Sequence, residues 1–93
     1  MTTRGYSATK DQLQQRLRRI EGQVRGVQGM VDDDRYCIDV LTQISAIQAA
    51  LYKVALGLLD EHARHCVMPA EGEDQIDKTD ELMAAVGRLM RRG

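Results

Sequence analysis

Residues 37–66 have the sequence CIDVLTQISAIQAALYKVALGLLDEHARHC, which contains no proline. Its apolar residues recur at steps of three and four, a spacing that predicts one long amphipathic helix. The apolar positions with this spacing are Val40, Ile44, Ile47, Leu51, Val54 and Leu58. Small residues near Ala49 lie midway along the stretch, so we expect another helix to approach closely there.

Cys37, His62 and Cys66 fall on one stripe of this predicted helix. At ~100° per residue, His62 lies about 20° to one side of Cys37 and Cys66 about 20° to the other. Cys37 and His62 are still roughly 37 Å apart along a straight helix, so one chain cannot bring them to the same ion. Two copies packed antiparallel would place Cys37 of one beside His62 and Cys66 of the other, giving two identical sites.

Two thiolates and one imidazole form a soft set of ligands, which favours Cu(I). Zinc stays open as an alternative, since water or a carboxylate could complete its usual four ligands. His65 lies about 80° off the stripe, and we expect it to face solvent. The competing interpretation makes Cys37 and Cys66 small buried apolar residues and His62 a histidine favoured by a helix C-terminus. The shared stripe argues against it.

The chain before this helix predicts a second one, at about 9–31. Its apolar residues also step by three and four: Leu13, Leu17, Ile20, Val24, Val27 and Val31. Thr9 and Gln12 have the spacing of a capping box. We expect the acidic run Asp32–Asp34 to end this helix and to cap the next, at about 34–67. The glycines Gly22, Gly26 and Gly29 indicate either a bare outer face or a close backbone approach.

Beyond the central helix, Pro69 and the polar residues 71–74 predict a break, followed by a shorter helix at about 74–92. No alternating strand pattern is present. The fold class is therefore all-α, with three helices in a single domain spanning 1–93. We find no signal peptide and no apolar run long enough for a bilayer, so we expect a cytoplasmic protein with two reduced cysteines.

Charge is segregated along the chain, although the formal net charge is −1. Residues 1–31 hold six basic and two acidic residues, a balance of +4, whereas 32–66 and 67–93 carry −3 and −2. Scattered arginines usually just keep a helix surface solvated. Judged by composition alone, this interpretation is favoured over nucleic-acid binding. No helix-turn-helix signature is present, so any DNA binding must come from an assembled basic surface.

Several motifs resemble the copper-sensing repressors of the CsoR/RcnR family over nearly the whole chain. They are RLRRIEGQVRG at 16–26, YCIDVL at 36–41, QISA at 43–46, Glu61-His62 and His65-Cys66. The resemblance implies an antiparallel four-helix-bundle dimer that pairs into a flat homotetramer. It implies a metal held by Cys37 and the His62 and Cys66 of a second subunit. In this family nickel and cobalt sensors have histidine in place of Cys66, and persulfide sensors lack His62, so this chain has the copper pattern.

The resemblance also implies roles for residues outside the ligand set. Tyr36 and Glu81 would lie beside the metal ligands, with Glu81 accepting a hydrogen bond from the free ring nitrogen of His62. Arg16 and Lys53 would contact double-stranded operator DNA. Charge alone adds three weaker candidates for DNA contact: Arg18, Arg19 and Arg25.

The expected mechanism is allosteric, with the apo tetramer binding operator DNA and Cu(I) causing its release, which derepresses copper export or buffering genes. Two alternatives stay open. Cys37 and Cys66 of different subunits could form a disulfide or persulfide switch, or the chain could be a metal-buffering bundle that ignores DNA. We expect neither an enzyme, since no nucleophile, base and orienting carboxylate can be assigned, nor a small-molecule substrate.

Overall fold

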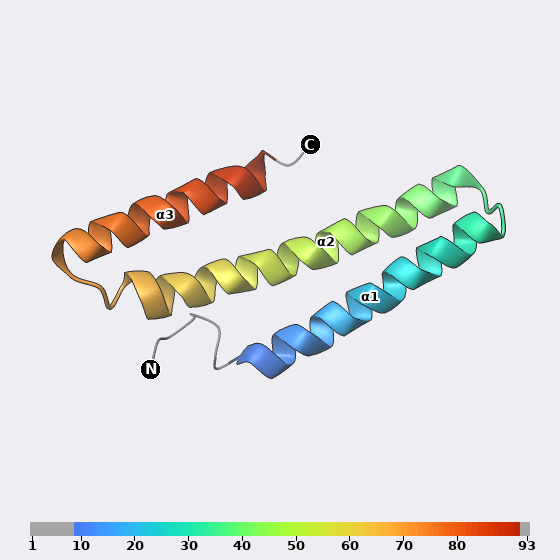
Figure 1. The fold of residues 1–93 in the computed structure, drawn as a ribbon. Coiled ribbons are helices and arrows are strands. Elements are labelled where there is room, and N and C mark those ends of the chain that lie inside the picture. The colour runs from blue at the N-terminus through green and yellow to red at the C-terminus, as the bar shows by residue number, and fades with distance from the viewer. Residues whose placement is uncertain (1–8, 92–93) are drawn as a thin grey trace. The chain divides into compact units, whose positions relative to one another are not determined.

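The computed structural model describes residues 9–91, which form helices without strands (Figure 1). Helix α1 spans Lys10–Asp32, α2 spans Cys37–His62, and a five-residue π-helix, η2, continues α2 over Ala63–Val67. Helix α3 spans Gly72–Met90. The all-α class with three helices is thus confirmed, while the dimer and tetramer expected from the resemblance stay predictions.

The described residues divide into two compact units, 9–56 and 57–91. The single domain expected for residues 1–93 stays a prediction, and each unit is described separately below.

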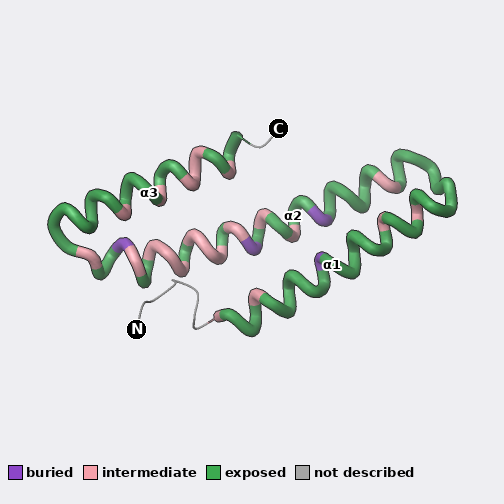
Figure 2. Tube along the Cα trace, viewed as in Figure 1, coloured by how far each residue is buried: buried purple, intermediate pink, exposed green. Residues whose placement is uncertain are grey.

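The unit formed by residues 9–56 is a helical hairpin in which α1 and the first part of α2 run antiparallel (Figure 1). Its buried side chains are Ile20 of α1 and Ile47 and Val54 of α2 (Figure 2). Leu17 and Val24 flank Ile20 in the apolar seam of α1, the side formed by its apolar residues at steps of three and four, yet they are 41% and 44% exposed. The apolar seams of α1 and α2 are therefore only partly covered within one protomer.

The hairpin turn is a Schellman motif at the end of α1. The N–H of Arg35 donates to the carbonyl of Met30 at 2.9 Å, and the N–H of Asp34 donates to Val31 at 3.1 Å. Asp34 adopts the left-handed conformation that this motif requires, with φ of 55°. The acidic run thus terminates α1 but does not cap α2, which begins at Cys37 and not at residue 34.

The predicted capping box at the start of α1 was wrong. Thr9 is the N-cap residue, as expected, but its side chain makes no capping hydrogen bond. Its backbone has φ of −116° and ψ of 12°, outside the extended conformation usual for a capping side chain.

The unit formed by residues 57–91 contains the end of α2, the π-helix and α3, which packs against the π-helix. The N–H of Met68 donates to the carbonyl of Ala63 at 2.9 Å, a bond that spans five residues and not four. Pro69 follows, and it has no N–H to continue the helix. The predicted end at residue 67 is confirmed, but the last five residues form a wider turn than an α-helix.

Helix α3 starts at Gly72, two residues before the predicted position. Gly72 has φ of +59°, which allows the chain to turn sharply from the extended Glu71 into the helix. The helix ends at Met90, and Arg91 is its C-cap. The predicted end at residue 92 lies outside the described residues.

Residues 37–67 are long and apolar enough to cross a membrane, judged by length and composition alone. The expectation that no stretch reaches this limit was therefore wrong. The expectation considered only uninterrupted apolar runs. This helix instead meets the limit by its mean hydropathy, which is averaged over polar residues such as Gln43, Gln48 and Lys53 as well. Polar groups at these intervals would be costly in lipid and suit a helix that packs against other helices.

Candidate metal centre and nucleic-acid interface

Cys37 is the first residue of α2 and its side chain is exposed. The preceding residue, Tyr36, is 67% exposed, and its carbonyl accepts hydrogen bonds from the N–H groups of Asp39 and Val40 at 3.0 and 3.2 Å. These bonds form the first turn of the helix and hold Cys37 at its very start. The thiol is free and accessible to a ligand from outside the protomer.

His62 and Cys66 lie at the other end of the helical stretch, and both are half-buried. His62 closes α2, whereas Cys66 belongs to the π-helix. The sequence-based angle for Cys66 assumed ~100° per residue, which does not apply in a π-helix because each turn contains more residues. The predicted 20° offset of Cys66 was therefore wrong, and its direction is set by the wider turn.

His65 is exposed, as predicted, with 48% of its side chain accessible. Its Nε2 lies 3.0 Å from Oε2 of Glu61, one helical turn earlier. This pairing orients His65 along the surface and distinguishes it from His62.

Within residues 9–91, no three side chains of cysteine, histidine, aspartate or glutamate come together in an arrangement that could hold a metal ion. The ligand types of Cys37, His62 and Cys66 nevertheless fit Cu(I), since neither cysteine forms a disulfide and all three residues are at least partly accessible. Bringing the three together needs a second subunit, and this stays a prediction.

Tyr36 and Glu81 were expected beside the metal ligands. In the described part of the chain both side chains are exposed, and Glu81 makes no hydrogen bond to His62. Their proposed roles therefore depend on the assembled, metal-bound protein.

A groove in the unit 9–56 brings together three of the residues predicted to contact DNA. Arg16 and Arg19 of α1 and Lys53 of α2 line its sides, and it encloses about 500 Å³. The other lining residues are Ile20, Gln23, Ala46, Ala49 and Ala50. The alanines are too short to fill the space between the cationic side chains, so the groove can accept an anionic group such as a phosphate.

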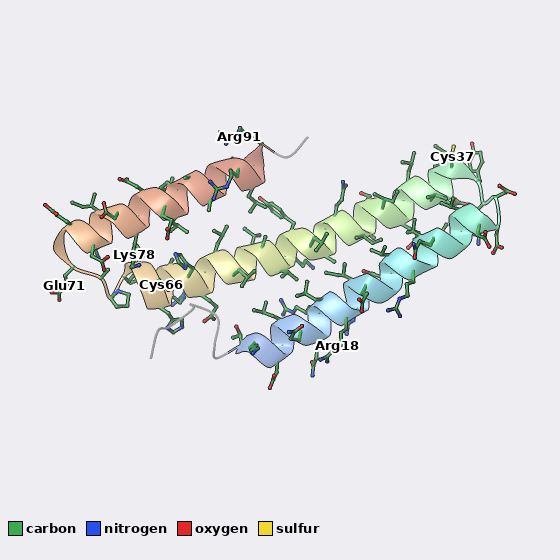
Figure 3. All side chains as sticks on the ribbon, in the orientation of Figure 1. Arg18, Cys37, Cys66, Glu71, Lys78 and Arg91 are labelled. Carbon is green, nitrogen blue, oxygen red and sulfur yellow. The ribbon has the colours of Figure 1, made fainter. Side chains whose placement is uncertain are left out.

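Arg18 and Arg25 are not part of this groove. Arg18 is about 200° from Arg16 around α1 and points away from α2 (Figure 3). Arg25 lies 3.7 Å from Glu21, and both side chains are largely exposed, so their ion pair contributes little to stability. Of the three residues chosen by charge alone, Arg19 therefore lines the groove, whereas Arg18 and Arg25 do not.

Sequence reasoning missed Gln23, although its position was available. Gln23 follows Arg16 by seven residues and Arg19 by four, so all three share one face of α1. Its amide adds a neutral donor to the groove.

The family model described as metal-sensitive transcriptional repressor matches residues 9–88. The chain belongs to this family. It is 57% identical over 90 residues to the copper-sensing transcriptional repressor RicR of Mycobacterium tuberculosis, which covers 94% of each chain. It is 58% identical over 76 residues to the copper-sensing transcriptional repressor CsoR of Bacillus subtilis, covering 77% of this chain and 75% of the relative.

The solved structures include a similar member of the metal-sensitive repressors. The crystal structure of the copper-sensing repressor CsoR with Cu(I) from Geobacillus thermodenitrificans has a TM-score of 0.81 and 49% identity. The match covers 98% of this chain and 95% of that one. The resemblance identified from the motifs is therefore confirmed, and these relatives are named as transcriptional repressors.

Proposed function

We propose that this chain is a copper(I)-responsive transcriptional repressor of the cytoplasm. The observation that carries the proposal is its 57% identity, over 94% of its length, to a copper-sensing transcriptional repressor. The soft ligand set of Cys37, His62 and Cys66 supports the choice of metal. A small soluble regulator of this kind needs no membrane and no small-molecule substrate.

The metal centre forms between two antiparallel α2 helices. Cys37 of one subunit and His62 and Cys66 of the other are the ligands, with Tyr36 and Glu81 nearby. Ile44 and Leu51 lie on the same side of α2 as Cys37 and are 38% and 45% exposed, so a second α2 helix can cover them. Two such dimers form the homotetramer.

Operator DNA binds at the basic grooves of the tetramer. Arg16, Arg19 and Lys53 contact phosphates, and Arg18 and Arg25 lie outside the groove and contribute less. Contacts of this kind position the protein on the duplex and make the affinity depend steeply on salt concentration.

Metal binding and DNA binding are coupled through the α2 helices. Bound Cu(I) supplies a crosslink between the start of one α2 and the end of the other. The crosslinked helices hold the attached α1 helices at a spacing where the basic grooves no longer match the phosphates. Typical coupling free energies are about 1–3 kcal/mol, and DNA must weaken metal binding by the same factor.

The test is a titration of operator DNA with the protein, with and without Cu(I), using wild type and His62→Ala. Wild type should release DNA on adding Cu(I). His62→Ala should keep some copper through its two thiols but lose most of the release. His65→Ala is the matched control, since His65 is exposed and paired with Glu61, and it should behave as wild type.

Normal copper-dependent release by His62→Ala would contradict the proposed centre. Copper binding with no operator binding at moderate salt would instead indicate a metal-buffering bundle. Release under mild oxidation without copper, with a crosslinked dimer on non-reducing electrophoresis, would indicate a thiol switch at Cys37 and Cys66.

A further inference from the structure

The chain between the π-helix and α3 leaves backbone carbonyls that the helix itself does not use. Met68 donates its N–H to Ala63, and Ala70 donates to the carbonyl of Val67 at 3.2 Å. Pro69 has no N–H and can satisfy none of the preceding carbonyls. The end of the π-helix therefore depends on donors from elsewhere.

Gln75, in the first turn of α3, supplies a donor in addition to the Ala70 N–H. Its side-chain Nε2 lies 3.3 Å from the carbonyl oxygen of Val67 and 3.4 Å from that of Met68. An amide nitrogen carries two hydrogens, so Gln75 can donate to both carbonyls at once. Val67 is also one of the few buried side chains among residues 9–91, and α3 packs against the π-helix that contains it.

We propose that Gln75 is a positioning residue for Cys66, an inference that rests on the proposed function. Cys66 directly precedes Val67 in the π-helix, so hydrogen bonds that fix the carbonyls of Val67 and Met68 also fix the backbone that carries the thiol. The direction of Cys66 is then set by the docking of α3. Metal ligation at Cys66 in turn shifts the docking of α3, because coupling is reciprocal.

The chemistry of the amide makes the proposal testable with near-isosteric changes. Gln75→Glu has almost the same shape but replaces both donors with an acceptor that repels the two carbonyls. Gln75→Met keeps the length of the side chain without either donor or charge. Ala84→Glu is the matched control, since it places the same new charge at an exposed position of α3.

Hydrogen exchange of the apo protein is the first measurement. In both Gln75 variants the hydrogen-bonded amides of Met68, Ala70 and Gln75 should exchange at least about 10-fold faster than in wild type, because this segment opens locally. Ala84→Glu should not change them. Unchanged exchange in the Gln75 variants would show that the hydrogen bonds do not hold this segment, and would overturn the proposal.

Copper binding is the second measurement, by competition with a Cu(I) chelator and by X-ray absorption. Residues that orient metal ligands typically change affinity by about 10-fold or more, so both Gln75 variants should bind Cu(I) about 10-fold more weakly. Sulfur scattering should also decrease as Cys66 leaves the centre. Apo variants should bind operator within about twofold of wild type, since no groove residue has changed.

Faster exchange with wild-type copper affinity and sulfur scattering would make Gln75 merely structural and would overturn the proposal. If Gln75→Glu fails to fold, Gln75→Met alone decides between these outcomes. Wild type that binds no copper would refute the proposed function, while the exchange measurement would still test the hydrogen bonds by themselves.

Discussion

Two glycines of this chain have open space around them but opposite backbone requirements. A Cβ added at Gly26 or at Gly72 would meet no atom within 4 Å. Gly26 lies in the middle of α1, where glycine is unfavourable, whereas Gly72 has φ of +59°, which L-residues rarely adopt. Sterics are therefore equal at the two sites, and only the backbone conformation differs.

We expect Gly26→Ala to stabilise the protein by about 1 kcal/mol and Gly72→Ala to destabilise it by about 1 kcal/mol. Urea unfolding at one fixed protein concentration measures both, since stability of an oligomer depends on concentration. Equal signs for the two substitutions would show that contacts with another subunit, and not backbone conformation, govern one of the sites.

At the scale of single residues, the sequence supported the ligand types more firmly than their geometry. Cys37, His62 and Cys66 could be chosen because thiols and imidazoles are few and because these three fall on one stripe of an ideal α-helix, which the π-helix then alters for Cys66. The π-helix could not be predicted, since the apolar spacing of one five-residue turn does not distinguish it from the end of an α-helix. Gln75 gave no signal either, because its carbonyl partners lie across a turn with no regular spacing.

Among the helices, α1 combines an incomplete apolar seam with a basic side that faces the groove. Helical spacing predicted the seam, and Ile20 is its buried centre. The same spacing explains why Arg16 and Arg19 reach the groove while Arg18 points away (Figure 3). Net charge alone could not separate these residues, because it carries no direction around the helix.

Arg16→Ala should weaken operator binding and reduce the slope of log affinity against log salt by about 1 for each subunit that contacts a phosphate. Arg18→Ala removes the same charge from the opposite side of α1 and should change the slope less. Fluorescence anisotropy with an operator fragment at several salt concentrations gives both slopes. Equal losses for the two variants would mean that net charge, and not the groove, determines binding.

For the whole molecule, the decisive feature is how little one protomer buries. Its buried apolar side chains in the described residues are Ile20, Ile47, Val54 and Val67. Most residues along all three helices are coloured as exposed in Figure 2. Large apolar side chains are among them, including Leu41, Ile44, Leu51, Ile76, Met83 and Met90. The spacing of the apolar residues predicted which side of each helix is apolar, but it could not show which partner covers that side.

Ile44→Glu and Leu51→Glu should each disrupt assembly, because a carboxylate would be placed where a second α2 is expected to pack. Sedimentation velocity should show a loss of oligomer, together with a lower midpoint of thermal unfolding. Gln48→Glu is the control, since it adds the same charge to α2 at a polar, exposed position. Oligomers of unchanged size in both apolar variants would place the interface on another side of α2.

The small number of buried side chains has a consequence for the amount of folded protein that a cell can maintain. A newly made chain that gains most of its stability from its neighbours folds fully only after meeting another copy, so the folded fraction rises more than linearly with synthesis. Chains made at low rates would be lost to proteolysis before they associate. Repression would then begin at a threshold of expression and not in proportion to it.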